Sequence, residues 1–111
     1  MNNDINTREA YISGIVPKIT SVLPVSEMYL FGSSARGDIT ADSDVDVYVV
    51  IDDDYTGSRY DAAGAAITAI RSDDNYIATD IIVHKKSDFE WRKDKFVLER
   101  VMMREGVKLY G

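Results

Sequence analysis

The sequence lacks cysteine and contains little histidine or proline. It contains no cysteine, which excludes disulfides and thiolate metal sites, and only one histidine and two prolines in 111 residues. No apolar run reaches the roughly 18 residues that a membrane-spanning helix needs, and no basic-then-apolar signal segment follows Met1. We therefore expect a cytoplasmic protein with no membrane association and a single domain over residues 1–111.

Basic residues are outnumbered by acidic ones. The 13 Lys and Arg residues face 19 Asp and Glu residues, which gives a net charge of −6. Binding to a nucleic acid backbone depends on clustered Lys and Arg, so this balance argues against a nucleic acid polymer as partner. A small phosphate compound carried by a metal ion remains compatible with it. The apolar content of 45% and aromatic content of 10% indicate a folded chain rather than a disordered one.

Hydrophobic periodicity predicts helices that alternate with strands. The first helix is expected to start near Thr7, with Asn6 and Glu9 as a capping box, and to kink or break near Gly14. Strands are predicted at 26–31, 45–51, 76–84 and, as an edge strand, 107–110; helices are predicted at 34–39, at 59–71, and from Ser87 to Gly106. This order predicts an α/β (α+β) layer fold with one sheet.

A glycine-serine pair follows the first predicted strand. Gly32 permits a left-handed backbone and a close backbone approach, and the amides at a helix start bind anions. Ser33 adds a hydroxyl donor at the same place. By itself the pair favours an ordinary strand-to-helix turn with serine as the cap.

Three acids lie where strands are predicted. Asp44 and Asp46 are two residues apart at a strand start, so their side chains leave from one face. Two charges about 4 Å apart repel by roughly 1 kcal/mol in water and roughly 4 kcal/mol at an effective dielectric constant of 20. Asp80 lies inside the next apolar run. Three carboxylates that converge from two strands form an oxygen site suited to Mg²⁺; a calcium loop would need Gly in place of Val47 and Glu in place of Asp53.

The spacing of these residues is that of a known signature. Gly32-Ser33, ten intervening residues and Asp44-x-Asp46 together resemble the motif of the DNA polymerase beta-like nucleotidyltransferase superfamily. Arg36-Gly37 and the Ser43-Asp44 pair resemble its minimal nucleotidyltransferase branch, as does the Glu105–Tyr110 tail. Asp80 lies on the following strand, where that family keeps its third carboxylate.

The resemblance implies a fold, a reaction and a set of site residues. The family fold is a mixed sheet backed by helices, and its members bind two Mg²⁺ ions and use ATP as a substrate. The catalytic and metal-binding residues implied here are Asp44, Asp46 and Asp80, and the nucleotide-binding residues are Gly32, Ser33, Arg36 and Ser43. In the two-metal scheme one ion activates an acceptor hydroxyl and the other stabilises the pyrophosphate leaving group.

The resemblance also implies a partner. Minimal members are often the antitoxin of a HEPN-type toxin and transfer AMP from ATP to a tyrosine of that toxin, so a homo- or hetero-oligomer is expected. Two alternatives stay open: a nucleotidyltransferase for a small molecule such as an aminoglycoside, and a catalytically silent protein that binds nucleotide or masks a partner. The pattern of residues 1–111 describes the nucleotide site well and the acceptor hardly at all.

Overall fold

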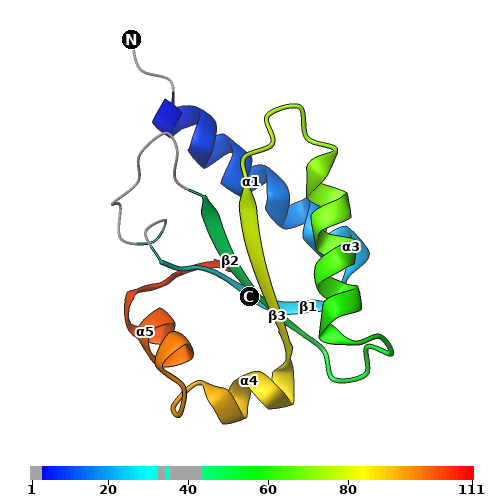
Figure 1. Cartoon of the computed structure of the whole chain (residues 1–111), viewed down its shortest axis with the longest axis vertical. Helices are drawn as coiled ribbons and strands as arrows, with labels where there is room; N and C mark the ends of the chain where they lie inside the picture. The colour runs from blue at the N-terminus through cyan, green and yellow to red at the C-terminus, as the bar shows by residue number, and fades with distance from the viewer. Residues whose placement is uncertain (1–3, 33–34, 36–43) are drawn as a thin grey trace.

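The architecture is a four-stranded sheet with helices on both faces (Figure 1). The computed structural model describes residues 4–32, 35 and 44–111, with the backbone alone for residues 4–7. The strands are β1 (Val25–Leu30), β2 (Val45–Ile51), β3 (Thr79–Lys85) and β4 (Val107–Tyr110), in the order β3-β2-β1-β4. Strand β1 is antiparallel to β2 and β4, whereas β2 and β3 are parallel, so the expected mixed sheet is confirmed.

The sheet separates two hydrophobic clusters. On one face, α1 (Asp4–Val22) and α3 (Arg59–Arg71) bury their apolar sides against alternate residues of β2. On the other face, Tyr48 and Val50 of β2 pack with Phe89 of α4 (Lys86–Arg92) and Met102 of α5 (Val97–Glu105). Figure 1 shows α4 and α5 together at one end of the molecule, away from α1.

The first helix differs from its prediction. It starts at Asp4, so Asn6 lies inside it and is not its cap, and it continues through Gly14 and Pro17 to Val22. A proline inside a helix costs about 3 kcal/mol, which burial of the apolar stripe offsets. The least exposed apolar residues of α1 are Tyr11, Ile15 and Ile19.

Three elements have the predicted bounds: β2, α3 and β4. The start of α3 is fixed by a capping box, in which Ser58 Oγ accepts from the amide of Asp61 and Asp61 Oδ2 accepts from the amide of Ser58. Strand β1 begins one residue earlier than predicted, and β3 begins three residues later. The predicted edge strand is present as β4, paired with β1.

The single long helix predicted after Ser87 is wrong. The chain forms two helices, because Phe96 has an extended backbone with ψ of 143° and serves as the N-cap of α5. Phe89, Phe96 and Met103 recur every seven residues, a spacing that favours one continuous helix, but only Phe89 is buried while Phe96 and Met103 are exposed. The bend brings Arg92 Nε to 2.6 Å from Glu99 Oε2, seven residues along the chain. The short helix predicted at 34–39 lies almost wholly outside the described residues.

None of the helices that the structure describes is long and apolar enough to cross a membrane.

Candidate functional site

Two of the predicted carboxylates lie side by side on parallel strands. Asp46 of β2 and Asp80 of β3 are Cα partners, so their side chains leave from the same face of the sheet. Val45 and Val47 pack into the cluster on the α1–α3 face, which places Asp46 on the opposite face, the one that carries α4 and α5. Asp80 is exposed and Asp46 is half-buried. The register therefore forms an acidic pair at the end of the sheet where β2 and β3 begin.

Asp44 extends this acidic edge. It lies exposed immediately before β2, and its carbonyl oxygen accepts a hydrogen bond from Arg8 Nη2 of α1 at 2.8 Å. The amide of Val45 donates to the carbonyl of Ala78 at 2.9 Å, which ties the start of β2 to the residues just before β3. These two bonds hold the backbone of Asp44 close to the start of the neighbouring strand.

A buried hydroxyl pair holds the start of β3. Thr79 Oγ1 donates to the carbonyl of Ile77 at 2.7 Å, so the Tyr11 hydroxyl, 2.6 Å away, donates to Thr79. Burial raises the pKa of Tyr11, and the hydrogen bond to Thr79 opposes that shift without cancelling it. The residue that carries the third carboxylate, Asp80, follows directly. Helix α1 thus anchors both strand starts from which the acids project.

Gly32 brings the turn after β1 against Asp46. Its φ is +65°, a left-handed conformation that glycine adopts readily. A Cβ atom at this position would lie 2.7 Å from Asp46 Oδ2, closer than the carboxylate tolerates without moving. The amide of Phe31 donates to the carbonyl of Asp46 at 3.0 Å, and the amide of Ala35 donates to that of Gly32 at 3.1 Å. Glycine is required here because the turn and the carboxylate touch.

The remaining predicted nucleotide-binding residues, Ser33, Arg36 and Ser43, lie outside the described residues. Within the part of the chain that is described, no three His, Cys, Asp or Glu side chains are gathered closely enough to hold a metal ion as they stand. The donor chemistry nevertheless fits Mg²⁺, since the oxygens of Asp44, Asp46 and Asp80 project from adjacent strand starts.

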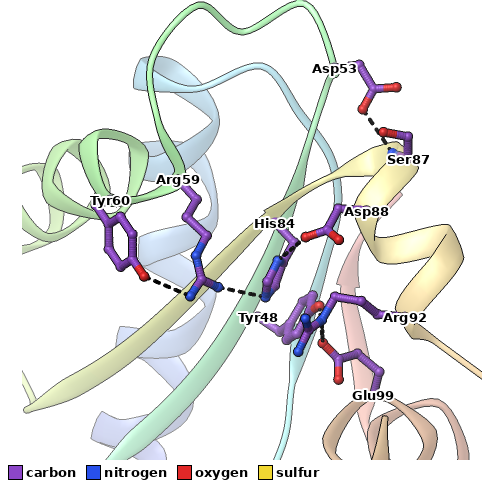
Figure 2. Close-up of polar contacts among 9 residues, drawn as sticks. All are labelled: Tyr48, Asp53, Arg59, Tyr60, His84, Ser87, Asp88, Arg92 and Glu99. Atoms are coloured by element: carbon purple, nitrogen blue, oxygen red, sulfur yellow. Dashed lines mark hydrogen bonds and ion pairs between the residues drawn. The ribbon is translucent and has the colours of Figure 1, made fainter. Parts of the chain in front are cut away.

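At the other end of β3, a polar network closes around the only histidine (Figure 2). Arg59 Nη1 lies 2.9 Å from His84 Nε2 and can only donate, so Nε2 is the acceptor and the imidazole proton is on Nδ1. Nδ1 donates to Asp88 Oδ2 at 2.6 Å. Burial lowers the pKa of His84, and Asp88 only partly opposes this. The ring stacks on Tyr48 at 5.6 Å and acts in packing rather than as an exposed ligand.

The same network contains a fully buried carboxylate. Glu99 Oε2 accepts from the Tyr48 hydroxyl at 2.7 Å and from Arg92 Nε at 2.6 Å, as Figure 2 shows. Burial acts to raise the pKa of Glu99, but the hydrogen bonds from Arg92 and Tyr48 outweigh it and lower the pKa. Burial and the bond to Glu99 raise the pKa of Tyr48.

Sequence reasoning missed Arg8 and Glu99. A tyrosine within an apolar strand was the available signal for Glu99, since a buried hydroxyl needs a partner. Arg8 gave no comparable signal, because its partner is a backbone carbonyl 36 residues away.

Two solved structures have a fold similar to that of this chain. No curated protein resembles the chain closely enough to count as a match. Among solved structures, a protein from Sulfolobus solfataricus described as a nucleotidyltransferase aligns with a TM-score of 0.64 at 23% identity, covering 97% of this chain and 86% of its own. A toxin-antitoxin with AMP-PNP aligns with a TM-score of 0.56 at 20% identity, covering 89% and 73%. At these identities the two structures establish the fold alone.

The sequence itself matches a family model over most of its length. Residues 12–103 fit the model described as the nucleotidyltransferase domain. This agrees with the resemblance inferred from Gly32-Ser33 and Asp44-x-Asp46, both of which lie within the matched range. The chain belongs to the nucleotidyltransferase domain family.

Proposed function

We propose that the protein is a Mg²⁺-dependent nucleotidyltransferase that transfers AMP from ATP to a hydroxyl of a partner protein, a tyrosine of a HEPN-type toxin. Family membership supports the reaction class. The observation that carries the proposal is the in-register pair Asp46 and Asp80 beside the left-handed turn at Gly32. The fold shared with a toxin-antitoxin that binds AMP-PNP supports the choice of nucleotide and partner.

The carboxylates of Asp44, Asp46 and Asp80 would hold the metal. Asp80 is exposed, so its side chain can rotate toward a cation at small cost. The backbone at Asp44 and at the start of β3 is held by Arg8 and by the Tyr11–Thr79 bond. When bound, Mg²⁺ polarises the phosphoryl oxygens and lowers the pKa of the acceptor hydroxyl.

The chain's own groups then position the reactants. The Gly32 turn allows phosphate oxygens to approach the backbone beside Asp46. Ser33, Arg36 and Ser43 are the further phosphate ligands that the motif predicts. The acceptor oxygen attacks the α-phosphorus of ATP, the bond to the bridging oxygen of the β-phosphate breaks, and pyrophosphate leaves. Asp80, on the outer strand, accepts the proton of the acceptor hydroxyl.

Labelling with α-³²P-ATP tests the reaction. The protein is incubated with Mg²⁺, labelled ATP and a HEPN-type toxin as the acceptor protein. The label is expected on that protein, and Asp46→Asn should reduce the rate at least about 100-fold, because loss of a metal ligand removes several kcal/mol of transition-state stabilisation. Asp74→Asn makes the same chemical change at an exposed loop residue and serves as the matched control.

Three outcomes decide between the hypotheses. Equal labelling by wild-type protein and Asp46→Asn would overturn the proposal. Label on an aminoglycoside but not on protein would retain the reaction class and reject the acceptor. Calorimetry that detects no binding of Mg²⁺-ATP to the wild-type protein would identify a catalytically silent member.

A further inference from the structure

An apolar cavity opens directly beside the Gly32 turn. It has a volume of about 310 Å³ and lies between that turn and helix α5. Six residues make most of its walls and define what we call the α5 groove: Phe31, Gly32, Val97, Leu98, Val101 and Met102. Glu105, at the end of α5, is the one carboxylate in the lining. The volume suits one or two large apolar side chains, at the lower end of the range for ligand pockets.

Helix α5, which forms one wall of the groove, exposes several apolar side chains to solvent. Val97 is 74% exposed and Leu98 37% exposed, although both face the cavity. Phe96 and Trp91, whose rings lie 5.5 Å apart, are 39% and 54% exposed and precede Val97 along the chain. Exposed apolar side chains gathered on one short segment mark an interaction site.

Two basic residues border the groove, although the chain as a whole is acidic. The net charge of the 111 residues is −6, with 13 Lys and Arg against 19 Asp and Glu. Arg100 and Arg104 are exposed and lie three residues after Val97 and Val101, which places them along the border of the groove. Arg104 is 3.6 Å from Glu105, an exposed ion pair of the kind that contributes little.

We propose that the α5 groove is the docking site for an acidic helical segment of a partner protein, which inserts apolar side chains beside Gly32 and places carboxylates near Arg100 and Arg104. The apolar lining favours a partner segment with apolar side chains, and Arg100 and Arg104 favour carboxylates on either side of them. The inference deepens the proposed function and rests on it in one respect: because the groove shares Phe31 and Gly32 with the nucleotide turn, the docked partner lies next to the bound ATP.

Binding of a designed peptide tests the groove without ATP or Mg²⁺. The probe is a fluorescent helical peptide of about 15 residues with a leucine stripe flanked by glutamates; its match carries lysines in place of the glutamates. Anisotropy should show the glutamate peptide binding at least about tenfold more tightly than the lysine peptide, with an affinity that falls as salt rises. Val97→Asp should weaken binding at least about tenfold, and Arg100→Glu severalfold.

Two variants outside the groove are the controls. Tyr60→Ser replaces an aromatic residue of α3 that is 73% exposed, and Arg71→Glu reverses an exposed charge at the end of that helix; both should leave peptide binding unchanged. Urea unfolding of each variant checks that the fold is intact, which is expected for Val97→Asp because the side chain it replaces is largely in water.

Equal affinity for the two peptides, or unchanged binding by Val97→Asp, would overturn the docking proposal. Self-association of the wild-type protein that Val97→Asp abolishes, with no peptide binding, would assign the groove to a second copy of the chain and would overturn it too. Calorimetry with Mg²⁺-ATP on the wild-type protein reads the nucleotide site separately. Nucleotide binding without peptide binding rejects the groove alone, and peptide binding without nucleotide binding rejects the proposed function alone.

Discussion

The two ends of the sheet face that carries α4 and α5 handle polar side chains in different ways. Where β3 ends, the buried carboxylate of Glu99 is paired with Arg92, and the buried, neutral imidazole of His84 donates a hydrogen bond to Asp88. Where β3 begins, Asp46 and Asp80 lie in register as like charges, an arrangement that destabilises neighbouring strands. Ionic groups that are matched within the fold stabilise packing, whereas two carboxylates in register on neighbouring strands offer oxygen ligands to a cation.

The largest expected effect on stability is at the matched end. Glu99→Ala removes the acceptor shared by Arg92 and Tyr48 and leaves both groups without it in a buried site. We expect the free energy of unfolding to fall by about 3 kcal/mol, at the lower end for breaking a buried pair because Arg92 is partly exposed. Urea unfolding measures this, with Glu105→Ala as an exposed control on the same helix that should change by less than about 0.5 kcal/mol. A loss for Glu99→Ala no larger than that of the control would contradict this account of the matched end.

A smaller effect is expected when the pH is lowered. Burial lowers the pKa of His84 below its ordinary value of 6.5, so in the window just below 6.5 the unfolded chain binds more protons than the folded one. Stability from neutral His84 is therefore fully present above that value and is lost as the pH falls through the window. Unfolding measured from pH 7 to pH 5 should show a steeper decline for wild-type protein than for His84→Gln. Identical slopes for the two proteins would show that His84 is not held neutral.

The smallest expected effect has the opposite sign and lies at the like-charged end. Asp80→Asn should raise the free energy of unfolding in EDTA by about 0.2–1 kcal/mol, because it removes a repulsive cross-strand pair. The same variant should lose the stabilisation that added Mg²⁺ gives the wild-type protein. Thermal unfolding with and without Mg²⁺ measures both changes, and Asp74→Asn should show neither. A variant that is less stable than wild type in EDTA would show that Asp80 is matched internally after all.

The fold was predictable where local pattern and tertiary packing agree. The β-branched run of β2 and the alanine-rich face of α3 gave their bounds correctly, because both elements bury the residues that the pattern marks. The heptad of Phe89, Phe96 and Met103 misled, since a repeat of seven is typical of one long helix. The bend between α4 and α5 is stabilised by the pair of Arg92 and Glu99, a tertiary contact that spacing does not reveal.

The acidic residues of the candidate site could be predicted from the sequence, but the contacts that hold them in place could not. The alternation of β2 and the acid inside β3 indicated that acids on two strands converge, and the strand register places Asp46 beside Asp80. The role of Asp46 and Asp80 as metal ligands stays a prediction. The role of Ser33, Arg36 and Ser43 in nucleotide binding also stays a prediction. The contacts that hold the site in place were not predictable, because Arg8 reads as a surface charge in a helix and its partner belongs to the backbone.

The grip of α1 on the two strand starts has a further consequence. Arg8 and Tyr11 lie one helical turn apart, and each reaches across to a different strand, at Asp44 and Thr79. Any ligand that stiffens the acidic edge must also suppress fraying of that turn, since the same bonds span both. We therefore expect amide hydrogen exchange in the amino-terminal helix to slow when the site fills, so that exchange in this helix reports occupancy of the site.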